Sequence, residues 1–190
     1  MTDRDILDAL ENSGAIRRGH FRLTSGRHSD TYVQCARVLE NPTLTMQLAR
    51  EMVARLPQDL NVDLVAAPAV GGIIIGFAVA AALDVPFIFS ERQNGQMTFR
   101  RAFHIPPNAH VLVVEDVVTT GGSVAEVTAL IKQADATVAA VTSLIDRGGE
   151  KAFTDPFYPL LPLDIASWEE SECKQCAEGL PIDSPGSRRL

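Results

Sequence analysis

The stretch VLVVEDVVTTGGS occupies residues 111–123 and joins three parts in a fixed order. Its apolar run predicts a strand, residues 111–115, buried in a parallel sheet. Two adjacent carboxylates, Glu115 and Asp116, end that run, and a loop rich in Thr, Gly and Ser follows them. Apolar residues at helical spacing then predict a helix over residues 124–134. Because free backbone N–H groups at a helix start bind phosphate well, the stretch predicts a sugar-phosphate site.

The two carboxylates have a defined task in such a site. Ionised acids at the end of a buried strand are costly to hold without partners. We therefore expect Glu115 and Asp116 to accept hydrogen bonds from sugar hydroxyls, with an ordinary acidic turn as the alternative. The loop would hold the phosphate through backbone N–H and hydroxyl groups, and it comprises Val117, Val118, Thr119, Thr120, Gly121, Gly122 and Ser123.

Two further loops carry residues suited to anions. Residues 67–72 lead from a predicted strand into a predicted helix, and adjacent glycines there let backbone approach a ligand closely. Residues 91–101 contain three arginines against one acid, and Asn94-Gly95 marks a turn. We expect this second segment to be a mobile hairpin that closes over an anionic ligand. The alternatives are a plain strand-to-helix turn and a solvated surface hairpin.

Alternating strands and helices set the predicted fold class. Residues 42–56, 73–83 and 124–134 have helical patterns, and residues 62–67, 86–90, 111–115 and 137–146 have strand patterns. Before them come a helix over residues 5–12, which Gly14 ends, and short strands within residues 15–39. The pattern predicts an α/β fold with a twisted, mostly parallel sheet that helices cover on both faces. Ligands in such sheets bind beyond the carboxyl ends of the strands.

Bulk properties exclude several classes of protein. The chain has 190 residues, enough for one domain, and its net charge of -7 argues against nucleic-acid binding. Three cysteines argue against a secreted disulfide framework, and the charged N-terminus does not resemble a signal peptide. Residues 65–83 carry no charge, but Pro68 and the Gly71-Gly72 pair argue against a membrane span. We expect a cytoplasmic enzyme.

The segment 111–123 resembles the phosphoribosyl-diphosphate (PRPP) signature of type I phosphoribosyltransferases. The resemblance implies one domain of that fold, with a core over residues 41–164 and a small hood from residues 1–40 and 165–190. It also implies PRPP as substrate, and Mg²⁺ held mainly by PRPP, so that no protein metal ligand is expected. Val70 and Gly71 would then bind diphosphate. The mobile loop would supply Arg92 and Arg100 to the leaving group, near the neighbouring active site of a homodimer.

Further segments resemble the short-chain branch of orotate phosphoribosyltransferases. The sequence FRLTSGRHS at residues 21–29 matches an N-terminal segment of that family, and Tyr32 and Val33 follow where the orotate pocket is expected. Residues 144–147, LIDR, resemble the strand end whose arginine contacts orotate, and Thr119 would lie beside it. The tail adds Cys173, Cys176 and the run PGSR at residues 185–188.

The orotate assignment also has a physical basis. Orotate carries a carboxylate, and Arg147 could pair with it, whereas Arg17, Arg18 and Arg22 are interpreted as a solvated basic strand. The sequence departs from the commoner family pattern, because Thr24 and Gly71 stand where many members have lysine. The mobile loop also lacks the usual Lys-x-x-Lys-x-His.

The resemblance implies transfer of phosphoribosyl from PRPP to N1 of orotate, giving orotidine 5′-monophosphate and diphosphate in pyrimidine synthesis. A purine or other base phosphoribosyltransferase and a PRPP-binding regulatory protein are the alternatives. Cys173 and Cys176 are expected to be reduced thiols. A zinc site would need two more ligands, and the histidines are scattered along the chain; a reversible disulfide is the other alternative.

Overall fold

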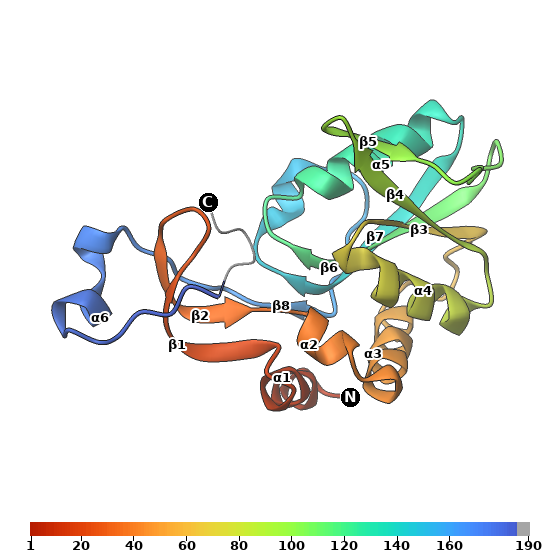
Figure 1. The fold of residues 1–190 in the computed structure, drawn as a ribbon. Helices are drawn as coiled ribbons and strands as arrows, with labels where there is room; N and C mark the ends of the chain where they lie inside the picture. The colour runs from red at the N-terminus through yellow and green to blue at the C-terminus, as the bar shows by residue number, and fades with distance from the viewer. Residues whose placement is uncertain (186–190) are drawn as a thin grey trace.

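A six-stranded sheet forms the centre of the computed structural model, which describes residues 1–185 (Figure 1). The strand order is β5-β4-β3-β6-β7-β8. All neighbouring strands run parallel except β4 and β5, which form an antiparallel hairpin. The strands are β3 (Leu64–Pro68), β4 (Phe87–Gln93), β5 (Gln96–Phe99), β6 (His110–Val118), β7 (Thr137–Asp146) and β8 (Leu161–Pro162).

Helices cover both faces of this sheet. Successive side chains of a strand point to opposite faces. Leu112 and Val114 of β6 accordingly join the core cluster that contains residues of α3 (Pro42–Ala54) and α4 (Gly71–Leu83). Val111 and Val113 join a second cluster with residues of α5 (Gly122–Gln133). Burial on both faces explains why β6 is apolar without alternation, as predicted.

The sheet has a topological switch point between β3 and β6. These strands are neighbours, although β4 and β5 separate them along the chain. The chain builds outward from β3 to one edge, returns to β6, and then builds to the other edge. Loops leaving two such strands diverge and open a crevice at their carboxyl ends. The loop before α4 and the loop before α5 both start there.

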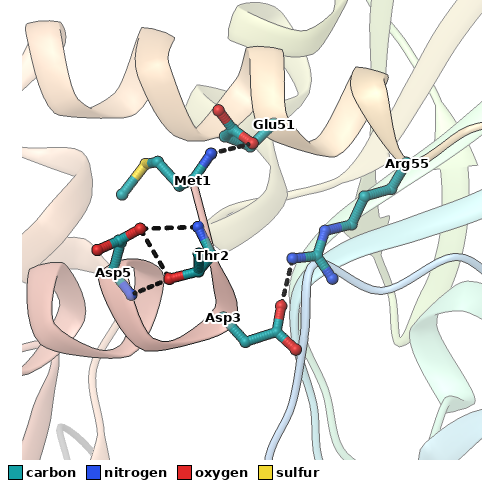
Figure 2. Close-up of polar contacts among 6 residues, drawn as sticks. All are labelled: Met1, Thr2, Asp3, Asp5, Glu51 and Arg55. Carbon is teal, nitrogen blue, oxygen red and sulfur yellow. Dashed lines mark hydrogen bonds and ion pairs between the residues drawn. The ribbon is translucent and has the colours of Figure 1, made fainter.

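The N-terminal segment forms a separate small layer. It contains α1 (Asp3–Asn12), an antiparallel pair of β1 (Ile16–Arg22) and β2 (His28–Val33), and α2 (Ala36–Leu39). Figure 2 shows a capping box at the start of α1 and two ion pairs that join α1 and its N-terminus to α3. The capping box is Thr2–Asp5, and the ion pairs are Met1–Glu51 at 2.9 Å and Asp3–Arg55 at 2.5 Å.

The C-terminal tail returns to this N-terminal layer. Figure 1 shows the tail and α6 (Lys174–Ala177) beside the β1–β2 hairpin. Isolated bridges join Phe21 to Asp183 and His28 to Trp168. Two short 3₁₀ helices, η1 (Gly149–Ala152) and η2 (Glu170–Glu172), lie between β7 and α6. Residues 186–190 lie outside the described part of the chain, and so do three of the four residues of the predicted tail match at 185–188.

The structure confirms most predicted elements and corrects four. The strand over 137–146 has the predicted bounds. Asn41 caps the start of α3, as predicted, and its side chain accepts a hydrogen bond from the N–H of Leu44. The acid pair lies inside β6, because pairing with β7 continues as far as Val118. Residues 36–39 are helical, residues 96–99 are a strand, and β8 was missed because it has only two residues. Within residues 1–185, no helix combines the length and apolarity needed to cross a membrane.

Candidate active site

The loop between β6 and α5 forms a small concave site. Gly121 has a φ of 72°, which L-residues with a Cβ rarely adopt, and it turns the chain into α5. No side chain caps the start of α5, whereas Thr2 caps α1 and Asn41 caps α3. The N-terminal N–H groups of α5 are therefore free to bind an anion. They open on a cavity of about 50 Å³ lined by Glu115 and residues 117–124.

The acid pair stands at the base of this loop. Burial of Glu115, followed by the nearby charge of Asp116, raises the pKa of Glu115 to about 9. The Asp116 N–H donates to Glu115 Oε1 at 3.0 Å, and the Val117 N–H donates to Asp116 Oδ1 at 2.9 Å. Within residues 1–185, neither carboxylate forms an ion pair. The two carboxyl groups can therefore bind hydroxyl or cationic groups of a ligand.

The loop between β3 and α4 meets the acid pair from the neighbouring strand. A Cβ atom at Gly71 would lie 2.5 Å from Asp116 Oδ1, and one at Gly72 would lie 3.1 Å from Glu115 Oε1. The Ala69–Val70 peptide bond is cis, and no side chain caps α4. A second uncapped helix start thus lies against the carboxylates, where it can bind a second anionic group.

A larger cleft of about 650 Å³ opens beside the predicted phosphate loop, residues 117–123. The four residues predicted to contact the base all line it: Tyr32, Val33, Thr119 and Arg147. The Nε atom of Arg147 is buried and has no hydrogen-bond partner in the described structure, and burial lowers the pKa of this guanidinium. Thr119 and Thr120 line both cavities, so a molecule in the cleft would lie next to a phosphate on the loop.

Comparison with known proteins agrees with this geometry. Residues 36–170 match the phosphoribosyl transferase domain, and full-length relatives carry the name orotate phosphoribosyltransferase. The chain belongs to the orotate phosphoribosyltransferase family. The relative from Heliobacterium modesticaldum is 48% identical over 99% of this chain and 100% of its own length. The relative from Chlorobaculum parvum is 48% identical over 99% of this chain and 97% of its own length.

A solved structure extends the match to three dimensions. The crystal structure of orotate phosphoribosyltransferase from Aeropyrum pernix superposes with a TM-score of 0.73 at 27% identity. The match covers 83% of this chain and 93% of that chain. The central sheet with flanking helices is therefore the type I phosphoribosyltransferase fold, as predicted.

The hairpin arginines predicted for this family's mobile loop are paired elsewhere. Asn94 and Gly95 both have positive φ, of 51° and 82°, the geometry of a tight hairpin turn. Arg92 donates to both carboxylate oxygens of Glu126 on α5, at 2.6 and 3.0 Å. Arg100 lies 3.9 Å from Glu91. Neither arginine lines the two cavities, so their role in catalysis stays a prediction.

The cleft also contains residues that were not assigned to the site from the sequence. Arg22, interpreted as part of a solvated basic strand, lines the cleft, whereas Arg17 pairs with Asp183 and Arg18 pairs with Glu11. The matching segment at residues 21–29 was the available signal for Arg22. The remaining unassigned lining residues are Leu23, Thr24, Ser25, Thr31, Ile165 and Ser167. Two of them, Ile165 and Ser167, come from the tail.

Proposed function

We propose that the enzyme transfers the 5-phosphoribosyl group of PRPP to N1 of orotate, giving orotidine 5′-monophosphate and diphosphate in pyrimidine synthesis. The observation that carries this proposal is the buried, unpartnered Nε of Arg147 in the cleft beside the phosphate loop. Arg147 is half-buried and forms no ion pair within residues 1–185, so an anionic ligand would stabilise its charge. Orotate brings a carboxylate, whereas purine bases bring none, and relatives at 48% identity carry the matching name.

One orientation of PRPP would use all of these groups together. The 5′-phosphate would lie on the uncapped start of α5, held by residues 119–123. The ribose hydroxyls would donate to Glu115 and Asp116, and the diphosphate would lie on the start of α4 at Val70 and Gly71. Asp116 lies against Gly71, so sugar and diphosphate sites adjoin. This direction leaves C1 of the ribose facing the cleft that contains Arg147.

The chemistry then follows from positioning and charge. Ring N1 of orotate forms a bond to C1, the C1–oxygen bond breaks, and diphosphate leaves with the bonding electrons. Positive charge develops on the ribose ring next to Glu115 and Asp116, which stabilise it electrostatically. Arg147 and Thr119 would hold the base in line for attack. No covalent intermediate with the protein is needed.

Mg²⁺ is the proposed cofactor. The donor atoms beside the diphosphate position are hard carboxylate oxygens, which suit Mg²⁺. Most ligands would come from PRPP itself, and Asp116, next to Gly71, is the protein group best placed to hold the hydrated ion. When bound, the ion would neutralise charge on the departing diphosphate.

We further propose a homodimer in which the β4–β5 hairpin serves the neighbouring site. An exposed apolar stripe runs along α4 at helical spacing. It consists of Val70, just before the helix, and Ile74 and Phe77 within it. An exposed apolar stripe next to an active site suits a contact between subunits. The hairpin would bring Arg92 and Arg100 to the diphosphate of the partner. Cys35, Cys173 and Cys176 form no disulfide, which favours a cytoplasmic location.

A base panel tests the proposal. The protein is mixed with PRPP, Mg²⁺ and one base at a time: orotate, uracil, adenine, hypoxanthine or guanine. We expect diphosphate release with orotate and none with the purines. Turnover of a purine without turnover of orotate would contradict the acceptor. Binding of PRPP without turnover of any base would instead favour a PRPP-binding regulatory protein.

A further inference from the structure

Four metal-binding side chains from distant segments meet at one point outside the active site. His20 and His28 come from β1 and β2, and Cys173 and Cys176 come from the start of α6 and from within it. Their ligand atoms all lie within 4.8 Å of one another, and residues 1–185 contain no other group of three or more such side chains. We propose that these side chains bind one Zn²⁺ ion in a Cys₂His₂ site. This proposal does not depend on the proposed activity.

The distances between the ligand atoms match the edges of a zinc tetrahedron. His20 Nε2 lies 3.3 Å from His28 Nδ1, 3.4 Å from Cys173 Sγ and 3.5 Å from Cys176 Sγ. Cys176 Sγ lies 3.2 Å from His28 Nδ1. Tetrahedral zinc with Zn–N bonds of about 2.0–2.1 Å and Zn–S bonds of about 2.3 Å has N···N edges of about 3.3 Å and N···S edges of about 3.6 Å. These four separations are close to those edges, and the remaining ligand-atom pairs lie within 4.8 Å, so one ion can occupy the centre.

Hydrogen bonding alone does not account for this convergence. An imidazole nitrogen carries either one proton or one lone pair, so it makes one good hydrogen bond. Three polar atoms nevertheless surround His20 Nε2 within 3.5 Å. At most one of these contacts can be satisfied by a proton, whereas a central cation satisfies all four ligand atoms together.

The surroundings also suit a metal. His20 Nδ1 lies 3.1 Å from the carbonyl oxygen of Leu180, so this nitrogen donates its proton there and Nε2 presents a lone pair to the cluster. His20, His28 and Cys173 are at most 6% exposed. Both thiols release their protons when they bind zinc. Two thiolates then balance the charge of Zn²⁺, which keeps the buried site neutral.

The zinc site would link the C-terminal tail to the β1–β2 hairpin. The hairpin contributes Thr24 and Ser25 to the cleft, and the tail contributes Ile165 and Ser167. A zinc ion held by both segments would therefore fix two walls of the cleft relative to each other. From the sequence we expected plain thiols at Cys173 and Cys176. The fold supplies the two missing ligands, because strand pairing places His20 and His28 next to the tail.

Metal analysis of the full-length protein tests this site. We expect about one zinc per chain after purification without chelators, as structural sites hold their metal tightly. After metal removal, added Co²⁺ should give the visible absorption of a tetrahedral thiolate complex. His28→Ala and Cys176→Ser should lose both signals. His104→Ala and Cys35→Ser are matched controls outside the cluster, and they should keep both.

Further outcomes separate zinc binding from the alternatives. Removing the metal from the wild-type protein should lower its Tm by several degrees, and adding zinc back should restore it. If the variants fail to fold, this titration of the wild-type protein with zinc decides whether the site binds metal. The proposal fails if the wild-type protein neither retains zinc nor binds added Zn²⁺ or Co²⁺. It also fails if mass spectrometry of the protein from a reducing cytoplasm finds a Cys173–Cys176 disulfide.

Discussion

The carboxylate of Asp116 lies directly against Gly71, so close that a Cβ atom at position 71 would be 2.5 Å from Asp116 Oδ1. Asp116 lies within β6, and Gly71 begins α4 just after the neighbouring parallel strand β3, at the switch point of the sheet. Their contact joins the proposed ribose site to the proposed diphosphate site. Any residue with a Cβ at position 71 would require the Asp116 carboxylate to move.

Gly71→Ala should therefore damage PRPP use more than folding. The added methyl must displace the Asp116 carboxylate and break its 2.9 Å bond to the Val117 N–H. We expect kcat/KM for PRPP to fall about tenfold or more, with Tm nearly unchanged, because alanine suits a helix start. Gly76→Ala is the matched control, since its Cβ would meet Phe87 within the core. Gly76→Ala should lower Tm and leave KM for PRPP unchanged. Wild-type kinetics in Gly71→Ala would refute the role of the contact between Gly71 and Asp116.

Glu115→Gln should stabilise the ligand-free protein while reducing activity. The folded protein binds the Glu115 proton more tightly than the unfolded chain, because the pKa rises from 4.5 to about 9. Wild-type stability attributable to this group is therefore fully present below pH 4.5 and is lost as the pH rises toward 9. Glutamine mimics the protonated acid, so Tm should exceed that of wild type by a few degrees at pH 8 and by little near pH 4.5. Thermal scans across this pH range check it, and a Tm difference independent of pH would rule out the explanation.

Mixed dimers test whether the hairpin serves the neighbouring subunit. Arg92→Ala and Arg147→Ala should each be nearly inactive alone. In a mixed dimer, one site would have its own Arg147 and an intact Arg92 from the partner. Random mixing should thus restore about a quarter of wild-type activity, since half of the dimers are mixed and each has one complete site. The opposite result is a co-expressed mixture that is no more active than the two single variants. That result would place Arg92 in its own subunit's site or outside catalysis.

Much of the fold could be predicted because apolar periodicity is local. The motif at residues 111–123 predicted a strand, a loop and a following helix, and the structure has all three. What the sequence could not indicate depends on contacts between distant segments. The ion pair of Arg92 with Glu126 needs the packing of the β4–β5 hairpin against α5. The meeting of His20 with Cys173 needs the tail to return across more than a hundred intervening residues.

The acid pair illustrates the same limit within a recognised motif. Its position before the phosphate loop was clear from the sequence, but its place inside β6 was not, because pairing with β7 continues through Val118. Strand ends are set by the partner strand as well as by local composition. The role of Arg22 was missed for a similar reason. Arg22 lines the cleft because the β1–β2 hairpin lies beside Arg147, the residue that follows β7.

In the proposed reaction, Arg147 recognises the carboxylate of the acceptor base. The most direct measurement compares kcat/KM for orotate and for uracil, which lacks the carboxylate, in the wild-type enzyme and in Arg147→Ala. We predict a strong wild-type preference for orotate and a fall of roughly ten- to a hundredfold in orotate use by the variant, with KM for PRPP retained. The variant should then barely distinguish the two bases. Wild-type use of orotate by Arg147→Ala would contradict the account.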